Sequence, residues 1–145
     1  MTETTAATDS VSPAEGRHLC GLFAATLAGD TPISTGSLAD RLGVSGATVT
    51  ETVQRLHDRG LTAYEPYTGT GLTSRGETVA RQMLWRRCLV QDFFETTTDV
   101  SLSDETAYRI ARAITREELS RFEERLARPC EGRCTASDRT DCDRL

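Results

Sequence analysis

Apolar residues recur at helical spacing near the start of the chain, between signals that begin and end a helix. Ser12-Pro13-Ala14-Glu15 has the form of a capping box with proline at the first helical position. The spacing holds until Gly29-Asp30-Thr31-Pro32, which stops it, and a helix over about residues 12–28 is therefore predicted. Its apolar positions are Leu19, Leu22, Phe23 and Leu27.

A short helix, a tight turn and a second helix are predicted next. The short helix covers about Ser37 to Leu42, and Gly43 supplies the turn. Ser45 can cap the following helix, and Gly60 ends it as a C-terminal glycine. The apolar stripe of this helix has spacing i, i+4, i+7 and consists of Val49, Val53 and Leu56.

A two-stranded wing and a helical extension complete the predicted order. Residues 61–73 place β-favouring residues on both sides of a Thr-Gly-Thr-Gly turn, and Pro66 confines this ribbon to an edge. A long helix is expected from Ser74 to about Phe94, before the polar segment 95–99. Two apolar stripes, Ala107 to Ile114 and Leu119 to Leu126, predict a final helix pair.

The pattern predicts a mainly α fold: an N-terminal winged helix-turn-helix with a small two-stranded wing, followed by a helical dimerisation domain. We expect a disordered arm over residues 1–11, the winged domain over 12–73, the dimerisation and sensor domain over 74–128, and a cysteine-rich tail over 129–145. The N-terminus is polar, and no apolar run approaches the ~20 residues that span a bilayer, so we expect a cytoplasmic protein without membrane contact.

The charge of the chain is uneven, which bears on nucleic-acid binding. The formal net charge is -5, but residues 35–91 carry seven arginines against five acids and are positive by two. The segments before and after this middle part are both acidic. A positive middle third fits a DNA-binding domain, whereas the acidic whole would suit a winged-helix module that binds proteins.

The helix after Ser45 has the character of a recognition helix. With its apolar stripe turned inward, short hydroxyl and amide side chains face outward, where they can reach base edges in a major groove. Nearby arginines would neutralise phosphates, which sets affinity and not sequence choice. The predicted contacts with double-stranded operator DNA are Ser45, Ala47, Thr48, Thr50, Glu51, Gln54, Arg55, Arg59 and Arg75.

Five segments together resemble the metal-dependent repressors related to the diphtheria toxin repressor and the manganese-transport regulators. They are LADRLGVS (residues 38–45), TVTETVQRL (48–56), GL (60–61), YEPY (64–67) and LTSRG (72–76). The resemblance spans about residues 12–128. It implies a homodimeric transcription regulator that acts as a repressor, whose last helices form the dimer and whose effector is iron, manganese or zinc.

The metal ligands that the resemblance implies are largely replaced. In the family, the metal lies between the first helix, the long helix after the wing and the next helix. The N-terminal ligand position is His18, which can still bind a metal, but the long-helix histidine position is Arg87. The downstream ligand positions correspond to Tyr108, Ala111 and Arg112, and the ancillary one to Asp104. Arginines in these positions repel a divalent ion.

Cysteines near those positions offer a second kind of switch. An odd number of cysteines, five, argues against a disulfide framework and for free thiols, soft-metal ligands or redox sensors. The tail has the spacing Cys-x3-Cys-x7-Cys, which loosely resembles the loops of iron-sulfur regulators. Core packing is the simpler interpretation of Cys20 and Cys88. The candidate metal or redox residues are His18, Cys20, Cys88, Asp92, Cys130, Cys134 and Cys142.

Three hypotheses follow: a DNA-binding regulator responding to a metal ion, the same frame switched by thiol oxidation or an iron-sulfur cluster, and a protein-binding winged helix. Enzyme activity is not expected, because the chain has two histidines, no phosphate-binding glycine loop and no His-Glu-x-x-His motif.

Overall fold

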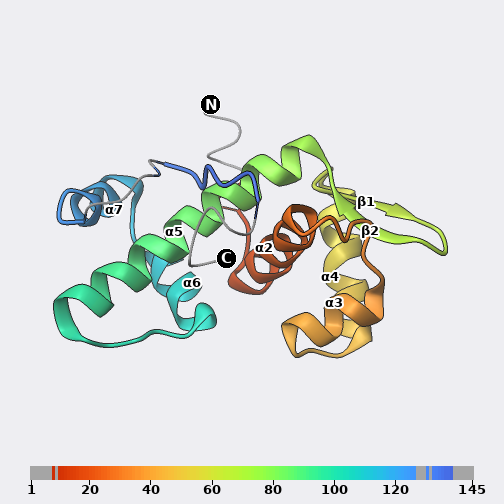
Figure 1. The fold of residues 1–145 in the computed structure, drawn as a ribbon, viewed down its shortest axis with the longest axis horizontal. Helices are drawn as coiled ribbons and strands as arrows, with labels where there is room; N and C mark the ends of the chain where they lie inside the picture. Colours follow the sequence, from red (N-terminus) through yellow and green to blue (C-terminus); the bar gives the residue numbers. More distant parts are fainter. Residues whose placement is uncertain (1–7, 9, 127–129, 131, 139–145) are drawn as a thin grey trace.

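A computed structural model describes residues 8, 10–126, 130 and 132–138 of the chain. In Figure 1 the long helix α5 runs from the wing at one end of the molecule to the helix pair α6 and α7 at the other, and α2 lies beside it. The elements in chain order are α2 (Pro13–Leu27), α3 (Thr35–Leu42), α4 (Gly46–Asp58), β1 (Thr62–Glu65), β2 (Gly69–Leu72), α5 (Ser74–Thr98), α6 (Asp104–Ala113) and α7 (Arg116–Glu123). This order confirms the predicted fold class.

Helix starts follow the caps in the sequence. Ser12 and Glu15 form a complete capping box at the start of α2, and Ser45 accepts the backbone N–H of Thr48 at the start of α4. The helix α3 begins earlier than predicted, because Ser34 and not Ser37 is its N-cap. The winged domain, residues 12–73, is called the winged head. Its core joins α2, α3 and α4 through Leu22, Ala25, Ile33, Leu38, Ala39, Val49 and Val53.

The wing is an antiparallel pair in which Thr62 faces Leu72 and Glu65 faces Gly69. On its other side β2 bonds to Ile33, whose N–H and C=O both pair with Thr70 at 2.9 Å. Gly69 has φ of +132°, and a Cβ there would lie 2.2 Å from the Ile33 carbonyl oxygen. Only glycine tolerates both this positive φ and this close approach to another backbone. Gly69 therefore allows β2 to pair with the segment between α2 and α3.

Helix α5 is longer than the sequence pattern predicted. We expected the helix to stop near Phe94, but it continues to Thr98, and Asp99 follows it in the left-handed conformation with φ of +58°. The Thr98 hydroxyl donates to the Phe94 carbonyl at 2.6 Å, and residues 95–98 are exposed. Polar side chains on a solvated last turn cost little, because they do not have to be buried.

The helix pair packs against the second half of α5. Trp85, Leu89 and Val90 of α5 share a core with Ala107 and Ala111 of α6 and with Leu119 of α7. Phe93 stacks on Phe122 with ring centroids 4.1 Å apart. None of the described helices has the length and apolar character of a membrane span.

Both ends of the described chain pack against this frame. Val11, which the sequence placed in the disordered arm, is 1% exposed and belongs to the core, and Thr8 hydrogen-bonds Gln82. In the tail the Cys134 N–H donates to the Arg81 carbonyl at 2.9 Å, and the Arg81 side chain donates to the Cys134 and Ala136 carbonyls. The arm and tail therefore contribute contacts that local patterns do not reveal.

Candidate nucleic-acid interface and sensor region

Helix α4 buries one face and exposes the other. Val49, Thr52, Val53 and Leu56 are buried against the head. The opposite face consists of exposed predicted contact residues: Ser45, Ala47, Thr48, Thr50, Glu51, Gln54 and Arg55.

The polar side chains of this face are held close to the helix. The hydroxyls of Ser45 and Thr48 lie 2.9 Å apart, and the Thr50 hydroxyl donates to the Gly46 carbonyl at 3.0 Å. Gln54 donates to the Asp58 carboxylate at 3.1 Å. These hydrogen bonds hold the side chains against the helix, so that another macromolecule can approach the α4 backbone.

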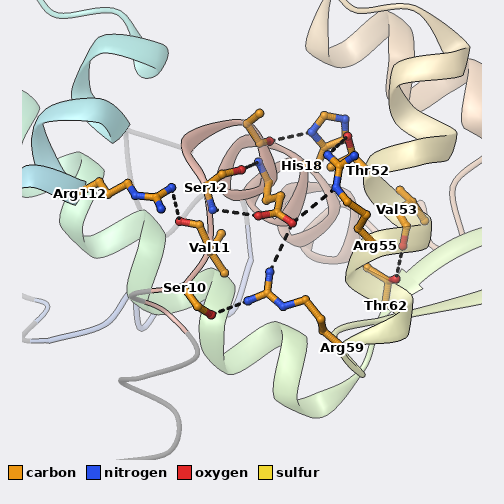
Figure 2. Close-up of polar contacts among 12 residues, drawn as sticks. Ser10, Val11, Ser12, His18, Thr52, Val53, Arg55, Arg59, Thr62 and Arg112 are labelled. Carbon is orange, nitrogen blue, oxygen red and sulfur yellow. Dashed lines mark hydrogen bonds and ion pairs between the residues drawn. The ribbon is translucent and has the colours of Figure 1, made fainter.

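Glu15 positions two of the candidate phosphate-binding arginines. Its carboxylate lies 3.3 Å from the Arg59 guanidinium and 3.9 Å from Nε of Arg55, while its other oxygen accepts the Ser12 N–H at 2.9 Å. Figure 2 shows the Arg55 and Arg59 side chains pointing from α4 and its C-terminal end toward the start of α2 at Ser12. Arg55 keeps 57% of its side chain exposed and Arg59 keeps 32%. The sequence shows the capping box, but nothing in it indicates these longer-range ion pairs.

Arg59 and Arg75, from the end of α4 and the start of α5, line one surface hollow of about 370 Å³ with Ser10, Asp58 and Leu61. Arg59 also donates to the Ser10 hydroxyl at 2.5 Å, and Arg75 is exposed. Two positive charges in the lining of this hollow suit a backbone phosphate.

The end of α4 is fixed to the wing. The Thr62 hydroxyl donates to the Val53 carbonyl at 3.0 Å, and Nδ1 of His57 lies 3.0 Å from the Thr62 carbonyl. The wing tip carries Tyr67, which is fully exposed and has φ of +65°. Sequence reasoning did not single out this side chain, although aromatic residues beside the turn were visible.

His18 is buried on α2 and faces α4. Its Nδ1 lies 2.8 Å from the Ala14 carbonyl, and its Nε2 has no hydrogen-bond partner among the described residues. Burial lowers the pKa of His18, and the nearby Arg17 and Arg55 lower it further. The ring is therefore neutral at pH 7, as a metal ligand must be.

Three candidate cysteines share one hydrophobic core. Cys20, Cys88 and Cys134 are buried in the cluster that joins α2 to α5, whereas Cys130 is buried beside α6 and α7. Burial raises the pKa of Cys20 to about 11 and also raises that of Cys134, so thiolate is scarce at neutral pH. These thiols are core groups in this state of the protein.

Of the remaining two candidates, Asp92 is within the part of the chain that the structure describes. Asp92 lies half-buried on α5, one turn beyond Cys88. Cys142 lies outside the described residues.

The residues at the implied metal positions do not form a cation site. In the described part of the chain, no three His, Cys, Asp or Glu side chains come together as metal ligands. Arg87 instead fills the space between α5 and α6, where its guanidinium lies 3.4 Å from the Tyr108 hydroxyl and 3.7 Å from the Asp104 carboxylate. Arg112, which the resemblance aligns with a ligand, donates to the Val11 carbonyl at 3.4 Å (Figure 2). A donor set with two guanidinium groups does not suit a divalent metal.

Comparison with known proteins decides the family. Residues 25–70 match the family model of the iron dependent repressor, N-terminal DNA binding domain. An uncharacterised HTH-type transcriptional regulator of Methanocaldococcus jannaschii is 31% identical over 93 residues, which make up 63% of this chain and 74% of that protein. The chain belongs to the iron-dependent repressor family. It is accordingly a transcription regulator with a DNA-binding winged helix-turn-helix.

Other proteins similar to this repressor-family chain are also named as transcriptional regulators, and one solved structure is named as a manganese regulator. The HTH-type transcriptional regulators MntR of Oceanobacillus iheyensis and Geobacillus kaustophilus are 32% and 30% identical, over 50% and 53% of this chain. The chain spans about half the length of each, 47% and 52%. The structure of the manganese regulator SloR has the same fold, with a TM-score of 0.68 and 19% identity over 76% of this chain and 52% of that one. These relatives are named as regulators, not as enzymes.

Proposed function

We propose that this repressor-family protein binds operator DNA as a homodimer, with the outward face of α4 in the major groove. The observation that carries the proposal is the division of α4 into a buried face, fixed to α2 and the wing, and an exposed face of short polar side chains. A rigid support of this kind holds base-reading groups in place before the duplex arrives.

The roles of the residues follow from their length and charge. Thr48, Thr50 and Gln54 reach base edges, where an amide can make paired hydrogen bonds with adenine. Arg59 and Arg75 bind phosphates at the hollow that they line. Ser45, Ala47, Glu51 and Arg55 complete the contact surface.

The dimer is formed by the helices that follow the wing. The family layout assigns dimerisation to this part of the chain, and two heads would then meet half-sites one helical turn apart. Sedimentation of the free protein and of its DNA complex measures the stoichiometry directly.

The effector is a separate element of the proposal. Membership of the family and the similarity to the manganese regulator SloR make a transition metal ion the first candidate effector. The buried neutral ring of His18 is compatible with such an ion, whereas Arg87, at an implied ligand position, is not. A switch based on thiol oxidation or an iron-sulfur cluster at Cys130, Cys134 and Cys142 stays a prediction.

Selection from a random duplex library, followed by fluorescence anisotropy over a range of salt concentrations, tests DNA binding. We expect an enriched site with two related halves, and an affinity that falls steeply with salt as phosphate contacts release counterions. Failure to bind duplex DNA at every salt concentration would contradict the proposal and favour the protein-binding winged helix.

A further inference from the structure

The Arg87 side chain is the centre of a polar network between three helices. It is 10% exposed, and its guanidinium lies near a hydroxyl, a carboxylate and a thiol; the Asp104 carboxylate is 58% exposed. One guanidinium nitrogen lies 3.4 Å from the Tyr108 hydroxyl and 3.7 Å from the Asp104 carboxylate, and the other lies 3.7 Å from Sγ of Cys88. The guanidinium carbon lies 5.8 Å from the centre of the Tyr108 ring.

The same network reaches α2 through Tyr108. This side chain is 1% exposed and shares a hydrophobic core with Cys20, and a Cβ on Gly16 would lie in van der Waals contact with its ring at 3.7 Å. Asp104 is oriented in turn by Gln91, which donates to it at 2.9 Å and to the Leu102 carbonyl at 3.2 Å. The arginine therefore joins the first helix of the winged head to α5 and α6.

The charge of Arg87 is permanent. Burial alone lowers the pKa of a guanidinium, but Tyr108, Cys20, Cys88 and Asp104 together raise the pKa of Arg87 above its ordinary value. A cation is thus built into the point where the resemblance placed a metal, and it already engages the Asp104 carboxylate and the Tyr108 hydroxyl. A divalent ion would have to displace it against charge repulsion.

We infer that Arg87 is a positioning residue that replaces the metal ion: it holds the winged head in its DNA-binding orientation on the dimerisation helices without any divalent cation. The inference rests on the proposed operator binding, since the head's orientation is what it explains. Arginine suits this role because its planar group makes several directed contacts at once, which an ammonium group makes less well.

The experiment compares wild type with Arg87→Met, which removes the charge at similar length, and with Arg87→Lys, which keeps it. The neighbouring Arg86→Met is a matched control for the loss of another buried arginine on α5. Each protein is measured for affinity to a selected duplex and for thermal melting, first in chelator and then with added Mn(II) or Co(II).

We expect the wild-type affinity in chelator and in metal to agree within about threefold. Arg87→Met is expected to bind DNA at least tenfold more weakly in both conditions, with Arg87→Lys recovering part of the loss and Arg86→Met losing less affinity. Activation of the wild type by either metal beyond tenfold, or an Arg87→Met protein that binds and melts like wild type, would overturn the inference.

A wild-type protein that binds no duplex is a different result, because it rejects operator binding itself. The melting temperatures then test whether Arg87 links α2 to α5 and α6. A metal-induced rise in the melting temperature of the wild type contradicts that role, whereas a fall for Arg87→Met that Arg87→Lys partly reverses supports it.

Discussion

The carboxylate of Glu15, in the first turn of α2, lies 3.3 Å from the guanidinium of Arg59 at the end of α4. This ion pair ties the start of the winged domain to the end of its recognition helix. It also lowers the freedom of an arginine that is proposed to meet a phosphate, so one carboxylate serves both helix capping and the alignment of the DNA-binding surface.

Replacing Glu15 separates these two effects. Glu15→Gln keeps an oxygen that can accept the Ser12 N–H but loses the ion pairs with Arg55 and Arg59, which should lower the unfolding free energy by about 0.5–1 kcal/mol. Glu15→Ala also loses the capping bond and should cost about 1 kcal/mol more. Denaturant unfolding measures the unfolding free energy of each variant. Equal stability of Glu15→Gln and Glu15→Ala would contradict a separate contribution from the capping bond.

Gln54→Ala tests base reading from α4. Loss of a paired amide contact should reduce discrimination at one position of the site by about 1–3 kcal/mol while leaving non-specific binding nearly unchanged. Competition between the selected duplex and single-base variants measures this. A uniform loss over all duplexes would instead assign Gln54 to a backbone contact.

Arg75→Gln tests the phosphate contacts beside the wing. The affinity should fall on every duplex, and the slope of log affinity against log salt should decrease in magnitude by about one. Arg109→Gln is the matched control, because Arg109 is exposed on α6 and is not one of the proposed DNA contacts. The prediction fails if the two variants have the same salt slope.

Gly76 allows the start of α5 to approach the wing. A Cβ at this position would lie 1.8 Å from the Leu61 carbonyl oxygen, so Gly76→Ala should destabilise the fold by about 1–3 kcal/mol. Gly36→Ala is the control, because no atom lies within 4 Å of its added Cβ, and it should stabilise α3 by about 0.5–1 kcal/mol. Thermal melting checks both predictions: the melting temperature should fall for Gly76→Ala and rise for Gly36→Ala.

The buried ring of His18 makes stability depend on pH. Its pKa in the folded state is lowered by burial from the ordinary 6.5, so the unfolded chain binds the proton more readily. The contribution is present above about pH 6.5 and is lost as the pH falls toward the lowered folded value. His18→Gln should flatten the decline in unfolding free energy in that acidic range, and an unchanged decline would exclude His18 as its cause.

Local patterns predicted the order of elements because helix caps and turns act over a few residues. Ser12, Ser45 and Gly43 occupy the cap and turn positions that their chemistry favours, and the helix-turn-helix follows. The outward face of α4 could also be derived, since Val49 and Val53 define the buried side. The end of α5 was misplaced because polar residues on an exposed last turn carry no periodic signal.

The contacts of Arg87 and of the buried cysteines could not be derived from local spacing. Arg87 meets Tyr108 and Asp104 only after α5 and α6 pack, and the backbone of Cys134 meets that of Arg81 across 53 positions of sequence. The cysteines looked like one group in the sequence because their chemistry is shared. Packing divides the four cysteines that the structure describes between two cores, and this division depends on the tertiary fold.

The most direct test of the account is whether α4 reads the major groove. The selected duplex is prepared with 7-deaza-adenine, which removes the major-groove N7 acceptor, and anisotropy gives its affinity for wild type and for Gln54→Ala. We predict that the substitution weakens wild-type binding at one position of each half-site by tenfold or more, and that Gln54→Ala no longer senses it. Wild-type binding that is indifferent to 7-deaza-adenine at every position would contradict the proposed role of Gln54 in the major groove.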